Sequence, residues 1–559
     1  MKNIAGNVMR NLRWLAAAAA LLPGAVCVAA PAEGAEGMPV LRSGGYELSF
    51  WTDGNRKTAS RGEVDPSLRP DVIALPAGRI TFASDRDTLT LSPAVWESVD
   101  FAVVTEEGDS AFVRFTRESA NPFEEPSPAM TKVAPSGLLS REQAEFDIRA
   151  LVYSLSEIHP DIYSVCGQAA FHRAVNEAVK GLPDSVSVAR LYLTAAPLVA
   201  MIGDGHTNLG FPFNNVFTEE LRRRPYTVGV SSDRRMVCTW SIDGRIPEGS
   251  EIVAINGMSR DSILDSMLPY VAGEREHFRL SRLDGVYSGL DYLLYPADSY
   301  TVEFLAPGKK KTATVTYPTV TWQDIKDVAP RGKDSGRHPD YSYRIDEKAG
   351  VAVMDFRSFN NPERMGHFAD SMFRELREKN IRDLVIDIRE NGGGNSDLGD
   401  TLLRYVSPIP FTQFDKSLVR VTPVSARLMG SGATPGLYFF EADTTGYIRP
   451  RTPAEGRYDG RVWLLVSNYT FSSAADFSWA FKEAGCGTVI GEETGGMSVS
   501  YGDILVYRMP VSKLRATVSY KRFWQFRADE NDIHGTLPDI EVPAADALDE
   551  ALRRIRQSR

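Results

Sequence analysis

Apolar and polar residues alternate one by one in the first part of this chain. Clear runs lie at residues 46–50 and 111–115, and Gly, Asp and Pro interrupt the chain between such runs. A two-residue period is typical of strands that bury one face and expose the other. The pattern therefore predicts a small N-terminal β domain over residues 38–125.

The spacing becomes helical after a linker that is rich in proline. Apolar side chains recur three and four positions apart, and Ser140 with Gln143 has the pattern of a helix start. We expect a helical segment over residues 136–214. Short strand-like runs then return over residues 215–320, which indicates another domain that contains strands.

Fully apolar runs replace the alternation in the last third of the chain. They lie at residues 351–354, 384–388, 462–466 and 488–490, with helical patterns between them. Strands that are apolar on both faces belong to a sheet that helices cover on both sides. Residues 321–559 are therefore predicted to form an α/β domain, which makes the whole chain a multidomain α+β protein.

The N-terminus has the pattern of a signal peptide. Three positive residues precede an apolar run over residues 14–22, and small residues follow through Ala32. This run is shorter than the roughly 20 residues of a membrane-spanning helix, and no integral membrane span is expected. We expect residues 1–32 to direct export to the periplasm or the medium and to be cleaved off. Cys27 follows Val26, a poor context for a lipid anchor.

Charge and cysteine usage disfavour several classes of function. Removal of residues 1–32 takes away three positive charges, so the formal net charge moves from -10 to -13. A nucleic-acid partner is therefore not expected. Cys166, Cys238 and Cys486 remain, an odd number without a CxxC pair, which indicates neither a disulfide framework nor a zinc site. We expect no cofactor, and the sequence leaves the oligomeric state open.

Two runs in the α/β region carry candidate chemistry. Residues 387–394 (DIRENGGG) leave an apolar strand and enter a turn in which glycines let backbone amides approach a ligand. Such amides can hold an oxyanion, whereas a phosphate loop would need a following Gly-Lys-Ser/Thr. Ser472 and Ser473 lie between a strand and a helix. A serine there is either a helix cap or a nucleophile beside free amides.

Four ordered runs resemble the C-terminal-processing/tricorn-core serine peptidases, also called tail-specific proteases. The family pattern is approximately Asp-Leu-Arg-x-Asn-x-Gly-Gly, Thr-x-Ser-Ala-x-Glu, Gly-Glu-x-Thr-x-Gly and Gly-x-x-Pro-Asp. The corresponding runs in this chain begin at Asp387, Thr470, Gly491 and Gly535. This resemblance implies a ClpP/crotonase-like core, a polypeptide substrate and an acyl-enzyme on Ser472.

The run GSEIVAING at residues 249–257 resembles the hairpin of PDZ domains, although Ser250 stands where Asp is usual. An ordinary hairpin with an Asn-Gly turn would give the same pattern. The resemblance implies a PDZ-like domain over residues 215–320, whose groove takes an extended peptide as an added strand. Such a groove would present an unstructured chain, in particular its C-terminus, to the peptidase core.

The family resemblance also distinguishes two kinds of catalytic base. In one branch a Lys follows the nucleophile by about 25 residues, and that position is Met497 here, whose thioether cannot accept a proton. In the tricorn-like branch the base is the His of an Asp-Gly-His motif, which matches His206. His159 is interpreted as a packing residue. His534 is the second choice of base.

The acid that orients His206 is assigned from the same resemblance. Asp532 lies three residues before the closing Gly535, where the family carries Glu, and Asp529 and Glu530 compete for the role. In the family the acid acts through the residue beside the His. Here that residue is Thr207 or Gly205, and Gly205 has no hydroxyl to relay a hydrogen bond.

The amides of Ser473 and of a glycine in the run 392–394, with Gly393 at its centre, are expected to hold the oxyanion. Ser473 is also the alternative nucleophile. Two other functions stay open: a peptidase-like scaffold without activity, and a carrier of apolar ligands. A Ser472 and a His206 beyond hydrogen-bond reach would exclude this catalytic pair, and a wide apolar cavity would favour a carrier.

Overall fold

The computed structural model describes most of the chain from Phe123 onward. It covers residues 125–328 and 338–558 apart from 431–432, 434–435, 443 and 530–531, together with Phe123 and six strands between residues 47 and 115. The predicted signal peptide and Glu530 lie outside the described residues. No helix in the described part of the chain is both long and apolar enough to cross a membrane.

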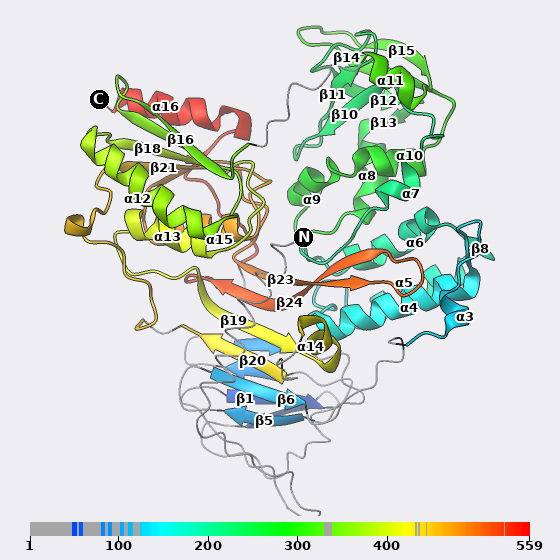
Figure 1. Cartoon of the computed structure of the whole chain (residues 1–559), viewed down its shortest axis with the longest axis horizontal. Coiled ribbons are helices and arrows are strands. Elements are labelled where there is room, and N and C mark those ends of the chain that lie inside the picture. The colour runs from blue at the N-terminus through cyan, green and yellow to red at the C-terminus, as the bar shows by residue number, and fades with distance from the viewer. Residues whose placement is uncertain are drawn as a thin grey trace, which may run out of the picture.

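A six-stranded sheet forms the centre of the C-terminal region (Figure 1). In spatial order its strands are β16 (Tyr341–Asp346), β17 (Val351–Phe356), β18 (Asp383–Asp387), β21 (Arg461–Val466), β22 (Thr488–Gly491) and β25 (Ile540–Glu541). All pairs are parallel except β16 with β17. The parallel strands β17, β18, β21 and β22 coincide with the apolar runs of the sequence, so the predicted strands are confirmed.

Helices cover both faces of this sheet. One face packs against α12 (Pro362–Glu378), α13 (Asp397–Val406) and α15 (Ser473–Glu483), and the other against α16 (Ala547–Gln557). Neighbouring strand residues point to opposite faces, so Met354 belongs to the first core and Val353 to the second. The burial of both faces explains why these strands are apolar throughout.

A seven-stranded sheet lies beside this core. Its strands are β23 (Val499–Arg508), β24 (Arg515–Gln525), β19 (Phe414–Val421), β20 (Gly436–Glu441), β6 (Ser110–Phe115) and β5 (Phe101–Thr105), and β9 (Asn208–Leu209) pairs with β24. Two strands of the predicted N-terminal β domain thus extend a sheet built from the C-terminal third. The other four form a separate sheet: β1 (Glu47–Thr52), β2 (Asn55–Ala59), β3 (Ile80–Ala83) and β4 (Thr88–Leu91).

The region between them contains a helical layer and a third sheet. The helices are α4 (Arg141–Ile158), α5 (Gln168–Lys180) and α6 (Val188–Ala200), and α4 begins with the capping box that Ser140 and Gln143 predicted. The sheet contains β10 (Tyr226–Val230), β11 (Met236–Ser241), β12 (Glu251–Ile255), β14 (Ser299–Leu305) and β15 (Ala313–Pro318). Its helices include α8 (Arg260–Met267), α9 (Glu276–Leu283) and α10 (Tyr287–Leu294). Its assignment as PDZ-like stays a prediction.

Candidate active site

Ser472 lies at the junction between β21 and α15 with an unusual backbone conformation. Its φ is 54° and its ψ is -135°, a region that residues with a side chain rarely occupy. Its side chain makes no capping hydrogen bond to α15. The structure therefore does not support the interpretation of Ser472 as a side chain that caps the helix. Strained backbone of this kind concentrates at functional sites.

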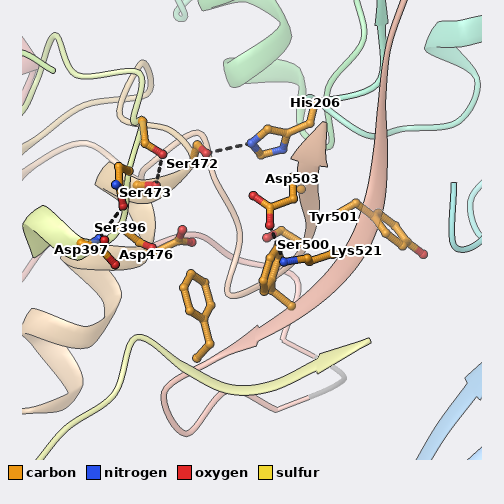
Figure 2. Close-up of a pocket in the computed structure, with 15 residues that line it drawn as sticks. His206, Ser396, Asp397, Ser472, Ser473, Asp476, Ser500, Tyr501, Asp503 and Lys521 are labelled. Atoms are coloured by element: carbon orange, nitrogen blue, oxygen red, sulfur yellow. Dashed lines mark hydrogen bonds and ion pairs between the residues drawn. The ribbon is translucent and has the colours of Figure 1, made fainter. Parts of the chain in front are cut away.

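His206 faces Ser472 directly (Figure 2). Its Nε2 lies 2.9 Å from Ser472 Oγ, although the two residues are 266 positions apart. The imidazole packs against the Phe471 ring at a centroid distance of 4.3 Å. The carbonyl of His206 accepts a 2.8 Å hydrogen bond from the Thr517 hydroxyl on β24. The pair meets the hydrogen-bond criterion that the sequence interpretation required.

Asp204 is fully buried beside His206. Its Oδ1 accepts a 2.8 Å hydrogen bond from the His206 amide and lies 3.8 Å from the ring Nδ1. Its Oδ2 accepts from the Ser519 hydroxyl at 2.6 Å and lies 3.3 Å from His159 Nε2. Burial favours the neutral acid, but the contacts with His159 and His206 outweigh it and hold the pKa of Asp204 well below its usual range. Asp204 therefore stays ionised. His159, which the sequence analysis interpreted as a packing residue, also contacts this carboxylate.

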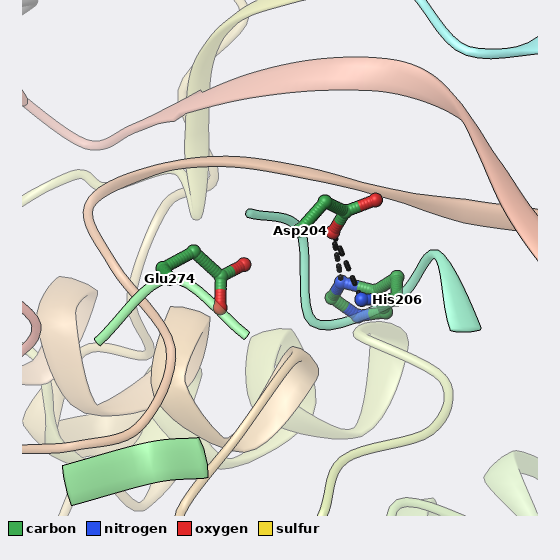
Figure 3. Close-up of side chains that lie close together, drawn as sticks. All are labelled: Asp204, His206 and Glu274. Carbon is green, nitrogen blue, oxygen red and sulfur yellow. Dashed lines mark hydrogen bonds and ion pairs between the residues drawn. The ribbon is translucent and has the colours of Figure 1, made fainter. Parts of the chain in front are cut away.

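Glu274 approaches the same histidine from the loop before α9 (Figure 3). Its Oε1 accepts a 3.1 Å hydrogen bond from the Gly205 amide. One oxygen of each carboxylate and one ring nitrogen of His206 lie within 4.8 Å of one another. Glu274 Oε2 and His206 Nδ1 are both buried, and neither has a hydrogen-bond partner among the described residues. Burial, and then the charge of Asp204, raise the pKa of Glu274 to about 7.

Gly205 makes this approach possible. A Cβ at that position would lie 2.6 Å from the Phe278 ring and 2.9 Å from both Glu274 Oε2 and the Phe471 ring. Glu274 thus occupies space that a side chain of residue 205 would fill. Burial disfavours the imidazolium of His206, but Asp204, Glu274 and Asp476 outweigh burial and raise its pKa above the usual 6.5.

The three groups Asp204, His206 and Glu274 are also ligand types for a divalent cation. Both oxygens of Asp204 already accept hydrogen bonds from the protein, and His206 Nε2 faces Ser472. This arrangement favours a proton-transfer network at Ser472.

Asp532 and His534 make their contacts elsewhere. Asp532 Oδ1 accepts a 3.0 Å hydrogen bond from the His534 amide, and His534 Nδ1 lies 3.2 Å from Glu493 Oε1. Within the described ranges, no contact joins Asp532 or His534 to His206 or Ser472. The carboxylates beside His206 are instead Asp204, which lies in the Asp-Gly-His motif itself, and Glu274, for which the sequence carries no signal.

The Gly-rich turn after β18 lies against the nucleophile. A Cβ at Gly393 would lie 2.7 Å from Ser472 Cβ and 2.8 Å from the Ser473 amide nitrogen, so only glycine fits there. The Gly393 amide donates to Asn391 Oδ1 at 2.9 Å. The amides of Gly394 and Ser473 donate to no acceptor in the described parts of the chain. The Ser473 hydroxyl donates to the Gly394 carbonyl at 2.9 Å, so it ties the turn to α15.

Residues 350–542 match the family model of peptidase family S41. The chain carries a peptidase family S41 domain. It is a serine-type peptidase, and the resemblance of its ordered motifs to this family is confirmed.

Several solved peptidase structures match this chain, and mature CPAF has a similar fold. Mature CPAF is 15% identical, matches 75% of this chain and 97% of its own chain, and gives a TM-score of 0.52. The photosystem II D1 C-terminal processing protease is 16% identical, with coverages of 73% and 96% and a TM-score of 0.38. A putative peptidase from Parabacteroides merdae is 13% identical, with coverages of 74% and 96% and a TM-score of 0.40.

A cavity of about 280 Å³ opens beside Ser472 and His206 in the peptidase (Figure 2). Besides the catalytic candidates, its lining includes Asp397, Phe414, Asp476, Asp503, Lys521 and Phe523. Lys521 Nζ lies 2.6 Å from Asp503 Oδ2. The cavity therefore carries several charged groups, which does not suit a carrier of apolar ligands.

Proposed function

We propose that the protein is an exported serine endopeptidase that cleaves unstructured polypeptides near their C-termini, with Ser472 as nucleophile and His206 as general base. The 2.9 Å contact between His206 Nε2 and Ser472 Oγ carries this proposal. A nucleophile and a base at hydrogen-bond distance, with the serine in a strained conformation, are what acyl transfer requires.

His206 takes the proton of Ser472 Oγ while Oγ attacks the carbonyl carbon of the scissile bond. We assign the developing oxyanion to the amides of Ser473 and Gly394, because both residues line the cavity with Ser472 and neither amide has a protein acceptor among the described residues. Gly393, the glycine that the sequence favoured, shapes the turn, since its amide is used by Asn391. The imidazolium then gives its proton to the leaving amine, and water releases the acyl-enzyme.

Asp204 and Glu274 orient His206 in this mechanism. The ring needs Nδ1 protonated so that Nε2 can accept a proton, and a carboxylate facing Nδ1 favours that tautomer. Asp204 Oδ1 lies 3.8 Å from Nδ1 and Glu274 belongs to the same cluster around His206, whereas Asp532, which the resemblance favoured, contacts His534. We therefore propose Asp204 and Glu274 for the role.

A second cavity supports the preference for chain ends. It has a volume of about 470 Å³ and lies along β10, which is an edge strand of its sheet. Aromatic residues line much of it: Phe217, Tyr226, Trp240, Tyr287, Tyr292 and Trp322. An end strand beside an apolar groove can accept an extended peptide as an added strand.

A serine-reactive phosphonate tests the catalytic pair. We expect labelling of the native protein, no labelling of Ser472→Ala, strongly reduced labelling of His206→Ala, and retained labelling of Ser473→Ala. Equal labelling of Ser472→Ala would exclude this nucleophile. A native protein that neither labels nor digests an unfolded polypeptide would favour the scaffold function.

A further inference from the structure

Asp476 lies one helical turn after the nucleophile and lines the active-site cavity (Figure 2). Its amide donates to the Ser472 carbonyl at 2.9 Å at the start of α15. Residues four apart on a helix share one face, and their side chains lean toward the helix N-terminus. The Asp476 side chain therefore leans toward the end of α15 at which Ser472 lies, and both residues line the same cavity.

Asp476 is nine-tenths buried, with 9% of the residue's surface exposed, and one of its two carboxylate oxygens has a hydrogen-bond partner in the described part of the protein. Oδ1 accepts a hydrogen bond from Gln525 Nε2 at 2.5 Å. Oδ2 has no hydrogen-bond partner, and the carboxylate forms no ion pair, within the residues that the structure describes. Burial raises the pKa of Asp476 to about 7. A buried carboxylate of this kind is costly unless a cation or a donor reaches it.

No lysine or arginine of the lining supplies that cation, and His206, whose positive charge would favour the Asp476 carboxylate, must be neutral to act as the proposed base. Lys521 is the one Lys or Arg among the lining residues, all of which are described, and its ammonium lies 2.6 Å from Asp503. Asp397, which is exposed, adds a further negative charge to the lining. Lys521 is thus paired with Asp503, and within the described residues no lysine or arginine of the lining pairs with Asp476.

The cavity walls suit a long aliphatic stem. Phe414 and Phe523 line it with rings 4.7 Å apart at an interplanar angle of 38°. Lysine and arginine bury their methylene stems against apolar surface and keep the charged end at a polar group. A volume of about 280 Å³ lies at the low end for ligand pockets, which suits a single side chain.

We propose that this cavity receives the side chain of the substrate residue that precedes the scissile bond, and that Asp476 selects lysine or arginine there. The inference rests on the proposed function, because it takes Ser472 as the nucleophile. The cationic group pairs with Asp476 Oδ2, and the stem lies against Phe414 and Phe523. Arginine is favoured over lysine where its planar guanidinium can donate two hydrogen bonds.

The test compares two substrates that differ only in charge. Fluorogenic peptides carry arginine or its uncharged isostere citrulline before the scissile bond, and kcat/KM is measured for the full chain. Hydrogen bonds to charged groups support an arginine-to-citrulline ratio on the order of 10- to 100-fold. In Asp476→Asn, which keeps the shape and an oxygen for Gln525, this ratio falls to within about threefold of one. The ratio is informative whatever the absolute rate of the variant.

Two further variants separate a specific contact from a general negative field. Asp476→Glu keeps the charge and is expected to keep the preference for arginine. Asp397→Asn, an exposed acid on the same lining, changes the ratio by about twofold or less. A ratio near one in the native enzyme, an unchanged ratio in Asp476→Asn, or an equal loss in Asp397→Asn would overturn the role of Asp476.

Failure of this inference is distinguishable from failure of the proposed function. If a phosphonate without a side chain labels Ser472 and the native ratio is near one, the pocket assignment is wrong and the nucleophile stands. If the native protein neither labels nor turns over any peptide, both are wrong. Should Asp476→Asn not fold, the labelling rates of the native enzyme with a benzamidine phosphonate and its phenyl analogue give the same comparison. Equal rates would overturn the inference.

Discussion

At the scale of single residues, His206 is held between a hydroxyl and two carboxylates. Asp204 is fixed by hydrogen bonds to Ser519 and to the His206 amide, whereas Glu274 Oε2 is held by none within the described ranges. Their negative charges favour the imidazolium, but a general base works only in its neutral form. The pH dependence of the enzyme therefore reports on this cluster.

We expect kcat/KM to rise with pH through an apparent pKa above 6.5, because the carboxylates raise the pKa of His206 and the rate needs His206 unprotonated. Glu274→Gln removes one of these charges, so the acidic limb should move to lower pH. The pKa of Glu274 is itself raised to about 7, so the apparent pKa of the acidic limb describes the joint titration of His206 and Glu274. A pH profile of kcat/KM measures both effects.

Asp532→Asn is the matched control for this profile. Asp532 contacts the His534 amide, so the variant should leave the acidic limb in place. If the acidic limb moved in Asp532→Asn and did not move in Glu274→Gln, Asp532 would be the acid that orients His206, as the sequence analysis favoured.

Gly205→Ala tests the close approach of Glu274. The added methyl would lie 2.6 Å from Phe278 and 2.9 Å from Glu274, so we expect a loss of about 1–3 kcal/mol in the free energy of unfolding together with a large loss of kcat. Urea denaturation and steady-state kinetics give the two quantities. Gly366→Ala is the control, because a Cβ there meets nothing within 4 Å in α12, and it should stabilise the helix by about 0.5–1 kcal/mol.

At the scale of elements, local sequence patterns predicted individual strands and a helix start. Apolar runs predicted the buried parallel strands, and Ser140 with Gln143 predicted the start of α4, because period and capping are properties of neighbouring residues. The pairing of His206 with Ser472 came from ordered motifs. Glu274 could not be predicted in this way, since its contact depends on how the loop before α9 packs against a segment 68 positions earlier.

The packing of α9 provides a prediction at this scale. Phe278 on α9 stacks on Phe471 at 4.3 Å and 24°, and Phe471 in turn packs against His206. We expect Phe278→Leu to lower kcat more than it changes KM and to cost about 1 kcal/mol of stability. Kinetics and thermal denaturation measure these effects.

Phe373→Leu is the control for Phe278→Leu. Phe373 stacks on Tyr405 at 4.3 Å and 8° within the core around α12, so a similar loss of stability should leave kcat unchanged. An equal loss of kcat in both variants would show that the effect is general and does not pass through His206.

At the scale of the whole molecule, the candidate site is assembled from three regions of the chain. His206 follows the helical layer, Glu274 belongs to the region of the third sheet, and Ser472 lies in the α/β core. The pairing of β9 with β24 joins the segment just after His206 to the seven-stranded sheet beside that core. The distances between these regions in sequence explain why composition and periodicity alone did not locate the site.

Arg420 is buried and connects the seven-stranded sheet to the helical layer through hydrogen bonds. From β19 it donates hydrogen bonds to the carbonyls of Ser156 at 2.7 Å and His159 at 2.6 Å, which connects the sheet to the end of α4. We expect Arg420→Ala to cost about 3–5 kcal/mol in the free energy of unfolding, because it leaves buried polar groups unpaired. Arg382→Ala, which removes an exposed ion pair with Asp459, should cost about 1 kcal/mol or less. Urea denaturation of both variants tests the difference.

The order of the catalytic groups along the chain has a consequence for when the enzyme can act. The residue proposed as base precedes the nucleophile by 266 positions, and the β9–β24 pairing that holds it forms only after the C-terminal strands exist. During synthesis His206 is made before Ser472, and β24, which pairs with β9, is made after both. The proposed catalytic pair can therefore assemble only when nearly the whole chain has been made and has folded.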